Sequence, residues 1–355
     1  MVIEHVLIFI ISIILLVESS DFLVEAAARI AKKIGLSEFF IGLTLVAVGT
    51  SVPELINSLY AAFRGHTAIA VGNVIGSNIT NISLILGVAA LIATRFNITE
   101  TMLKRDIYVL QFACMVFFLF ALISILPLYR GDFLISPSEG VILLALFFAY
   151  ILFLFEKKTV EEKKYHFKEF LNYFMSFEYI TTIRRNIFKL RRKKKIRKAA
   201  YIQREALFKD FLIIAIAAVG VFYGAKYLIN ETIWSARFFN IPESLIAMTV
   251  IAFGTTLPEF SVTISAARKR LGNIAIGNII GSNITNLLLI AGLASLVSPL
   301  KVAKPVLYFA IPFMIFVTFL LLYFVKSNWE LRRKEGVVLL LFYIIFLVTS
   351  YMLWL

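Results

Sequence analysis

Residues 47–54 read Ala-Val-Gly-Thr-Ser-Val-Pro-Glu, and residues 252–259 read Ala-Phe-Gly-Thr-Thr-Leu-Pro-Glu. A shift of 205 residues superimposes the two stretches, and the same shift aligns residues 41–87 with residues 246–292 without a gap. About half of the aligned pairs are identical. Self-similarity over such a length indicates a duplicated chain, in which each copy forms one half of the fold.

The composition is that of a membrane protein. Of 355 residues, 60% are hydrophobic and 16% are charged, whereas soluble domains are about 45–50% apolar. A membrane-spanning helix needs about 20 mostly apolar residues, and the sequence predicts ten such segments. They lie near residues 2–30, 36–63, 68–93, 106–127, 138–156, 208–234, 241–267, 273–299, 303–325 and 336–355.

Ten segments give five to each copy of the repeat. Because five is odd, the second copy enters the membrane from the opposite side to the first. We therefore predict an all-α polytopic membrane protein, with ten transmembrane helices as two inverted five-helix repeats at residues 1–156 and 208–355. A polar, basic linker at residues 157–207 joins them. Inverted repeats are a common plan of secondary transporters, whose substrate sites lie near the membrane midplane on interrupted helices.

Each quoted stretch lies inside an apolar segment and contains a glycine and a proline, which weaken a helix. We expect a helix break there, with backbone carbonyls that a membrane tolerates only where they line a cavity or bind an ion. Glu54 and Glu259 follow the two breaks, and neither motif contains a basic residue to pair with them. Because an intramembrane carboxylate is costly without a partner, we predict that the partner is a cation.

A second motif, Gly-Asn-x-Ile-Gly-Ser-Asn-Ile-Thr-Asn, occupies residues 72–81 and 277–286. It places Ser77 and Asn81, and likewise Ser282 and Asn286, four residues apart on one helical face. Carboxylate, hydroxyl, amide and carbonyl oxygens together suit a hard cation such as Ca²⁺, which takes about six to eight oxygen ligands. The other asparagines of the motif, at positions 73, 78, 278 and 283, we interpret mainly as packing residues.

These motifs closely resemble the two alpha-repeats of the sodium/calcium exchanger family, within the cation/calcium antiporter superfamily. The resemblance covers nearly the whole chain outside the linker. It implies exchange of Na⁺ for Ca²⁺ by alternating access, in which the long first and sixth helices slide across a central bundle, with no enzymatic activity and no cofactor. The family's ion ligands carry over onto the matching positions, namely Ala47, Thr50, Ser51, Glu54, Ser77, Asn81, Ala252, Thr255, Thr256, Glu259, Ser282 and Asn286.

The sequence departs from some members of that family at Asn286, where they carry an acid. In the potassium-dependent branch an aspartate at this position accompanies K⁺ use. Because this chain has an asparagine there, its site contains two carboxylates and not three.

A proton/calcium or other cation/calcium antiporter remains an alternative, although the motifs of proton/calcium exchangers have different sequences. A passive cation channel, which needs weak binding along an open pore, and an intramembrane enzyme, whose base or zinc ligands the motifs lack, are further alternatives.

The net charge of +14 follows from membrane topology rather than from nucleic-acid binding. Of the 36 Lys and Arg residues, 17 fall within residues 157–210. If the linker is cytoplasmic, most other basic residues lie on the same side, as the positive-inside rule requires. This orientation places both termini outside a membrane that we expect to be the cell membrane. The basic run at residues 191–195, with phenylalanines nearby, favours contact with anionic lipid.

Two charged residues outside the motifs occupy equivalent positions in the repeats, Asp21 in the first predicted helix and Lys226 in the sixth. Two interpretations are open. Asp21 forms a salt bridge with Lys226 between the long helices, or it belongs with Glu18 and Glu25 to an acidic stripe that faces the cytoplasm or a vestibule.

Overall fold

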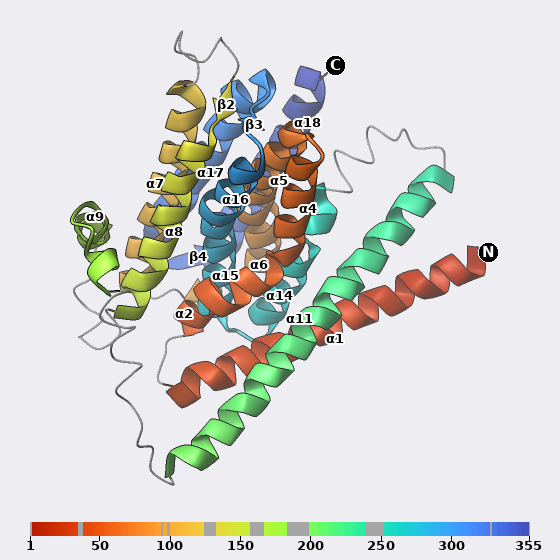
Figure 1. Ribbon diagram of the computed structural model, residues 1–355. Coiled ribbons are helices and arrows are strands. Elements are labelled where there is room, and N and C mark those ends of the chain that lie inside the picture. Colours follow the sequence, from red (N-terminus) through yellow and green to blue (C-terminus); the bar gives the residue numbers. More distant parts are fainter. Residues whose placement is uncertain are drawn as a thin grey trace.

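The chain forms a bundle of membrane-length helices, with two longer helices lying across it (Figure 1). The computed structural model describes residues 2–34, 38–93, 95–97, 100–123, 133–156, 167–182, 199–238, 252–326 and 329–354. The first half contains α1 (Val2–Ile34), α2 (Glu38–Ile41), the π-helical segment η1 (Gly42–Val46), α3 (Ala47–Thr50), α4 (Val52–Phe63), α5 (Thr67–Thr80), the π-helical segment η2 (Asn81–Ile85), α6 (Leu86–Ala93), β1 (Arg95–Asn97), α7 (Glu100–Ile123), β2 (Leu134–Ile135) and α8 (Pro137–Glu156).

The second half repeats this order of elements. After the short helix α9 (Phe167–Met175) come α11 (Ala199–Phe238), α13 (Ala252–Thr255), α14 (Leu257–Arg268), α15 (Gly272–Ile284), the π-helical segment η7 (Thr285–Ile290), α16 (Ala291–Val297), β3 (Leu300–Lys301), the π-helical segment η8 (Val306–Ala310), α17 (Ile311–Lys326), β4 (Glu330–Arg332) and α18 (Arg333–Trp354). The offset of 205 residues places β3 opposite β1 and α14 opposite α4.

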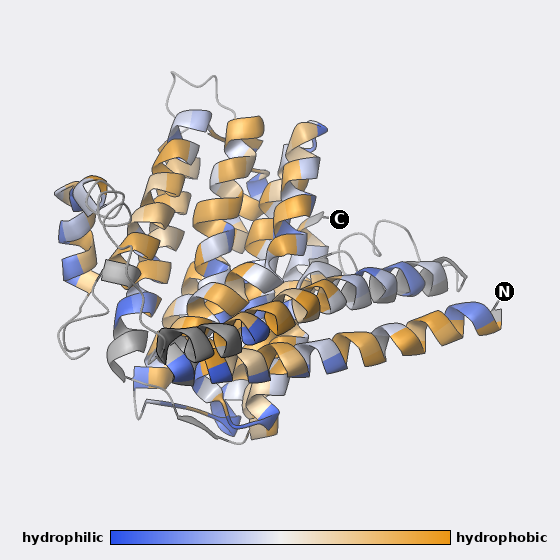
Figure 2. Cartoon of the chain, turned by 60° about the horizontal axis from the view of Figure 1, so that its bottom comes forward, coloured by the Kyte–Doolittle hydropathy of each residue, from blue (hydrophilic) through white to orange (hydrophobic). Residues whose placement is uncertain are grey.

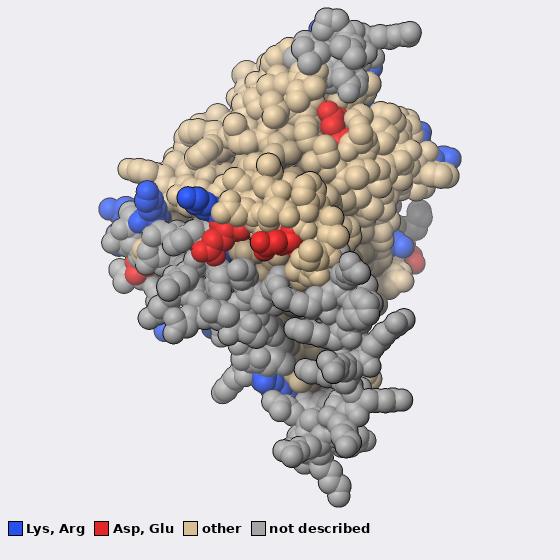
Figure 3. All heavy atoms as spheres, turned by 60° about the vertical axis from the view of Figure 1, so that its left-hand side comes forward, with Lys and Arg blue, Asp and Glu red and all other residues tan. Residues whose placement is uncertain are grey.

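The helices are long and apolar enough for a membrane. Within the described ranges, eight helices qualify as spans, and the bent pair from Gly42 to Phe63 can form a ninth. The predicted span at 241–267 is described only from α13 onward, and residues 241–251 lie outside the described residues. Hydrophobic residues predominate along the bundle helices (Figure 2), and charged atoms are sparse on the broad face in Figure 3. Both views agree with a polytopic membrane protein.

Two short antiparallel ribbons show that the repeats are inverted. β1, which follows α6, pairs with β4, whereas β3, which follows α16, pairs with β2. The span α7 runs between β1 and β2 along the chain, so the two ribbons lie at opposite ends of the bundle. Helix α6 therefore ends at one face and its counterpart α16 at the other, which confirms the predicted inversion.

The motif-bearing helices form the core, and the long helices lie outside it. In an apolar stretch of 18 residues within each span, 72% is buried for residues 67–93 and 83% for residues 272–297, against 24% in α1 and 28% in α11. Helices α1 and α11 lie side by side across the bundle in Figures 1 and 2. A Cβ added to Gly224 would lie 2.8 Å from the backbone nitrogen of Leu16, so glycine lets these two helices approach closely.

Two features go beyond the sequence analysis, which left open two interpretations of Asp21. Part of the stretch assigned to the linker is helical, because α11 begins at Ala199 and α9 packs its buried Phe170 against the rings of Tyr150 and Phe153. Asp21 does not pair with Lys226. It accepts a hydrogen bond from Ser265 and lies 3.7 Å from the Nζ of Lys269, both on α14, because α1 packs on α14 along this face.

The contact between the halves predicts a graded response to added methyl groups. A Cβ on Gly281 would lie 2.2 Å from the carbonyl oxygen of Leu43, whereas a Cβ on Gly87 meets first the Leu340 side chain at 2.8 Å. A backbone atom cannot yield as a side chain can, so Gly281→Ala should destabilise the fold far more than Gly87→Ala. Thermal unfolding of the purified variants in detergent, followed by tryptophan fluorescence, measures both. Equal midpoints would contradict this packing.

Candidate cation site

Both helices that carry the glutamates break where the sequence predicts. Helices α3 and α4 meet at Ser51, whose backbone leaves the helical range (φ −84°, ψ 9°), and the chain bends there by 50°. Helices α13 and α14 meet at Thr256 in nearly the same conformation (φ −89°, ψ 2°). A proline lies in the first turn after each break, Pro53 and Pro258, where its missing N–H costs no helical hydrogen bond.

The two glutamates begin the second part of each broken helix. Glu54 lies in the first turn of α4 and Glu259 in the first turn of α14, and both side chains are buried. Oε1 of Glu259 accepts hydrogen bonds from the hydroxyls of Ser51 at 2.9 Å and Ser282 at 3.2 Å. Among the described residues, neither carboxylate oxygen of Glu54 has a hydrogen-bond partner, nor does Oε2 of Glu259.

No described basic side chain forms an ion pair with either glutamate. The helix N-termini supply some positive potential, since each is equivalent to about half an elementary charge. This does not balance two buried carboxylates. The arrangement leaves oxygen lone pairs pointing into the bundle without a protein donor, which is the property expected of a cation site.

Asparagines join the two halves directly. Asn78 donates to the carbonyl of Asn283 at 3.2 Å, and Asn283 donates to the carbonyl of Asn78 at 3.1 Å. Asn81 donates to the side-chain oxygen of Asn283, and Asn286 donates to that of Asn78, at 2.8 and 3.0 Å. Each of these bonds therefore has a counterpart in the other half.

The donor groups of Asn81 and Asn286 are thus occupied, and their side-chain oxygens are not. Within the described ranges, both Oδ1 atoms are buried without a hydrogen-bond partner, and so is the hydroxyl of Ser77. Since an amide fixed through its nitrogen can offer only its oxygen to a further ligand, the network orients two neutral oxygens in the same region as the glutamates.

A second pair of bonds ties each helix break to the opposite half. The Thr50 hydroxyl donates to Asn278 Oδ1 at 3.3 Å, and the Thr255 hydroxyl donates to Asn73 Oδ1 at 3.1 Å. The side-chain amides of the two asparagines donate in turn. Asn73 donates to the hydroxyl of Ser58 at 3.0 Å, and Asn278 donates to the hydroxyl of Thr263 at 3.1 Å. Ser58 and Thr263 occupy equivalent positions in the repeats, and the sequence analysis did not select them.

The structure brings the predicted ligands to the centre of the bundle. Eleven of the twelve are buried, namely Ala47, Thr50, Ser51, Glu54, Ser77, Asn81, Thr255, Thr256, Glu259, Ser282 and Asn286. The twelfth, Ala252, begins α13. One hydroxyl departs from the symmetry of the repeats. The Ser51 hydroxyl donates to Glu259, whereas the hydroxyl of its counterpart Thr256 donates to the carbonyl of Phe253 at 2.9 Å.

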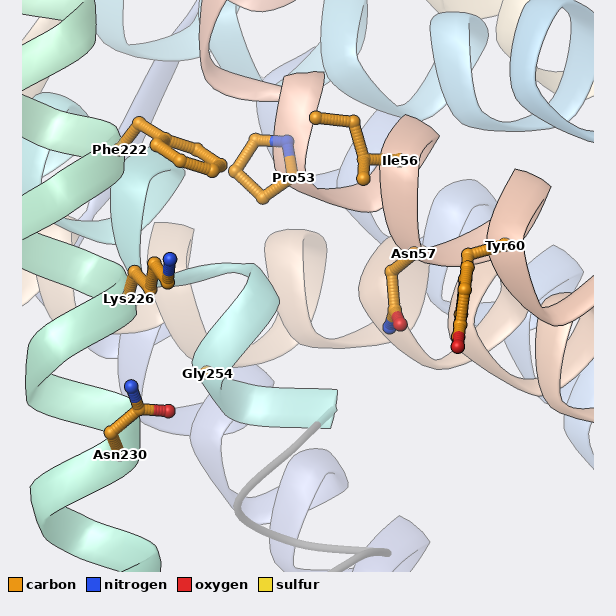
Figure 4. Close-up of a pocket in the computed structure, with 8 residues that line it drawn as sticks. All are labelled: Pro53, Ile56, Asn57, Tyr60, Phe222, Lys226, Asn230 and Gly254. Carbon is orange, nitrogen blue, oxygen red and sulfur yellow. The ribbon is translucent and has the colours of Figure 1, made fainter.

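The approaches to this centre differ on its two sides. Helix α14 is sealed against α1 by Ser265 with Asp21, by Lys269 with Glu25 at 3.0 Å, and by the Ser261 hydroxyl on the carbonyl of Leu16 at 3.5 Å. The equivalent pair, α4 and α11, instead borders an open cavity of about 250 Å³, together with Gly254 of α13 (Figure 4). The cavity is lined by Pro53, Ile56, Asn57, Tyr60, Phe222, Lys226, Asn230 and Gly254.

Inverted repeats around interrupted helices, with a buried polar centre between the repeats, are the architecture of a secondary transporter. The comparisons with known proteins agree. The family model described as sodium/calcium exchanger protein matches residues 4–156 and 209–352. The chain therefore belongs to the sodium/calcium exchanger family.

Two relatives match along nearly their whole length. A sodium/calcium exchanger, MaX1 of Methanosarcina acetivorans, is 41% identical over 99% of each chain, and the inner membrane protein YrbG of Escherichia coli is 31% identical over 97% of this chain and 96% of its own. The solved structure of the sodium-calcium exchanger NCX_Mj, soaked with Na⁺ and Sr²⁺, superimposes with a TM-score of 0.76 at 29% identity, over 98% of this chain and 99% of the other.

The asparagine network makes a prediction about stability. Asn283→Ala removes one side-chain donor and one side-chain acceptor between the halves, and it leaves the buried side-chain amide of Asn81 without its acceptor, which costs about 1–3 kcal/mol for an unsatisfied buried group. We expect the thermal midpoint of the purified variant to fall by several degrees. Asn172→Ala, on an exposed part of α9, is the control and should leave the midpoint unchanged. An unshifted midpoint for Asn283→Ala would show that the bonds between the halves are dispensable.

Proposed function

We propose that this chain is a secondary active antiporter that exchanges Na⁺ for Ca²⁺ across a membrane by alternating access. The observation that carries the proposal is Glu54, whose two carboxylate oxygens are buried without a hydrogen-bond or ion-pair partner among the described residues. A buried carboxylate in a membrane needs a cation or a proton. The name of MaX1 and the ion soaks of NCX_Mj support Na⁺ and Ca²⁺ as the cations.

The proposed ion ligands are the oxygens of the twelve motif residues described above. Glu54 and Glu259 provide the charge, and the hydroxyl and amide groups of Ser77, Asn81 and Asn286 provide neutral oxygens that are free to bind. The two negative charges of the carboxylates balance the charge of one Ca²⁺, and Ca²⁺ prefers a site made only of oxygen ligands. Transport needs these residues to bind and release ions, and it requires neither covalent chemistry nor a resident cofactor, so we do not propose an enzyme.

The unequal contacts of α1 and α11 support alternating access. Tyr60 on α4 and Ser265 on α14 occupy equivalent positions in the repeats. Tyr60 lines the cavity, whereas Ser265 contacts Asp21 of α1, so that this side is sealed. A transporter must open one approach while the other is closed. We infer that the two halves exchange these arrangements when α1 and α11 move together across the bundle.

For topology, we propose residence in the cell membrane with both termini outside. The support is the concentration of basic residues in the 157–207 linker, which we place in the cytoplasm, between repeats at 1–156 and 208–355. On this topology the cavity between α4 and α11 faces the outside. The basic linker run would then lie near anionic lipid of the inner leaflet.

The two glutamates give the direct test. Glu54→Gln or Glu259→Gln should reduce Na⁺-driven ⁴⁵Ca²⁺ uptake into Na⁺-loaded proteoliposomes to the level of empty liposomes, because each removes one of the two charges that balance Ca²⁺. Folding should survive, since a buried charge is removed rather than left unpaired. Glu4→Gln, on the exposed start of α1, should transport normally. Gradient-driven uptake by either site variant would refute the proposed ligands.

The amide at position 286 predicts the ion requirement. With no third carboxylate in the site, exchange should not depend on K⁺. Asn286→Asp adds a carboxyl group beside two others, and like-charge repulsion favours its sharing a proton. We therefore expect the variant to become sensitive to pH between about 5 and 8, or to K⁺. The measurement is Na⁺-driven ⁴⁵Ca²⁺ flux across that range with K⁺ replaced by choline, and an absolute K⁺ requirement in the wild type would contradict the charge argument.

A further inference from the structure

The seal on one side of the bundle and the cavity on the other occupy the same positions of the repeat. Helix α14 is held against α1 by Ser261 and Ser265 of α14 and by Asp21 and Glu25 of α1. The counterparts of these four residues in the other half all line the cavity, namely Ile56, Tyr60, Lys226 and Asn230. Tyr60 and Lys226 lie on its opposite walls (Figure 4). The cavity therefore lies where α4 and α11 lack the contact that α14 and α1 make.

One cation completes the seal. Lys269 caps the C-terminus of α14, and its Nζ lies 3.0 Å from Oε1 of Glu25 and 3.7 Å from Oδ1 of Asp21. The same Nζ donates to the backbone carbonyl of Asp21 at 3.3 Å. Lys269 thus joins two carboxylates of α1 to the end of α14, and we call Asp21, Glu25 and Lys269 the latch.

The other half cannot form this latch. The three latch residues correspond, in order, to Lys226, Asn230 and Arg64, so both charged members are basic. In this conformation each lies near an aromatic ring, Lys226 Nζ at 5.9 Å from the centre of Tyr223 and Arg64 Cζ at 5.8 Å from that of Tyr60. No acidic side chain in the described part of the chain forms an ion pair with either.

We propose that the latch favours the conformation described above, and that Lys226 and Arg64 are positioning residues that disfavour the opposite one. The inference rests on the proposed alternating access, in which the two halves exchange their arrangements. When α11 closes on α4 as α1 now closes on α14, Lys226 and Arg64 take the places of Asp21 and Lys269. Two like charges then face each other, so closing the cavity loses an attraction and gains a repulsion.

Exposure to solvent limits the size of the effect. The side chains of Lys269 and Asp21 are 26% and 35% exposed, and an exposed ion pair changes an equilibrium constant by about 1.4- to 5-fold. We therefore expect the latch to shift the balance between the two conformations by a few-fold, which leaves both of them accessible for exchange.

The test measures how often the sealed side opens. Val262 on α14 is buried and is the counterpart of Asn57, which lines the cavity. A cysteine introduced by Val262→Cys should therefore react with a water-soluble maleimide only while the α14 side is open. The rate is measured on the purified full-length chain in detergent with Na⁺ present. The chain has a single cysteine of its own, Cys114, which is buried, so the wild type gives the background rate.

The expected results follow the sign of the charges. Added to the Val262→Cys probe, Lys226→Asp should raise the labelling rate about two- to fivefold, because the new carboxylate can pair with Arg64. Arg64→Asp should raise it similarly by pairing with Lys226, and Lys269→Gln should raise it by weakening the latch. Lys226→Asp combined with Arg64→Asp should lose the gain, because two carboxylates repel. Lys226→Arg should match the unmodified probe, as should Lys168→Asp on the exposed face of α9.

Two results would overturn the inference. They are an unchanged labelling rate in both Lys226→Asp and Arg64→Asp, and a rise in the double variant that equals those of the single variants. If the wild type shows no Na⁺-driven ⁴⁵Ca²⁺ uptake in proteoliposomes, the proposed function fails and the inference fails with it. If uptake is present and is lost in Glu54→Gln, the proposed function holds, and the labelling rates then decide the inference alone.

Discussion

The structure depends on one constraint, which is that two carboxylates are buried in an apolar bundle without a basic partner among the residues that the structure describes. Burying an isolated charge in a membrane is costly, so everything near Glu54 and Glu259 either lowers that cost or makes room for a cation. The breaks at Ser51 and Thr256 point two helix N-termini at the carboxylates. The close contact of Gly281 with Leu43 lets the broken helices approach the motif helices closely enough to share this centre.

The asparagines explain how the two halves can meet at such a centre without adding charge. Amides both donate and accept, so Asn78 and Asn283 join the halves through reciprocal bonds while the side-chain oxygens of Asn81 and Asn286 remain available. Serine would be too short for both roles, and an aspartate would add a charge that the site would have to balance. A neutral interface that still presents oxygens is therefore well suited to a site that must release its ions.

Much of this was predictable from the sequence, because a duplication at a fixed offset constrains both the helix count and the inversion. The helix breaks and the burial of the motif residues followed from Pro53, Pro258 and the glutamates. Sequence could not predict which half borders the cavity, because that depends on how α1 and α11 pack against the broken helices. It also could not predict that Asp21 pairs across to Lys269 rather than with Lys226, because that contact depends on how α1 packs on α14.

The two halves of the chain form different hydrogen bonds at their glutamates. Glu259 accepts hydrogen bonds from Ser51 and Ser282, while Glu54 and its equivalent neighbour Ser77 have no such bonds. If the halves were identical, the mirrored arrangement would have the same free energy and neither would be preferred. They are not identical, and the differences fall where they matter, with Ser51 opposite Thr256 and Asp21 opposite Lys226. We infer that differences of this kind favour one of the two conformations that exchange requires, whereas the residues shared by the halves allow both.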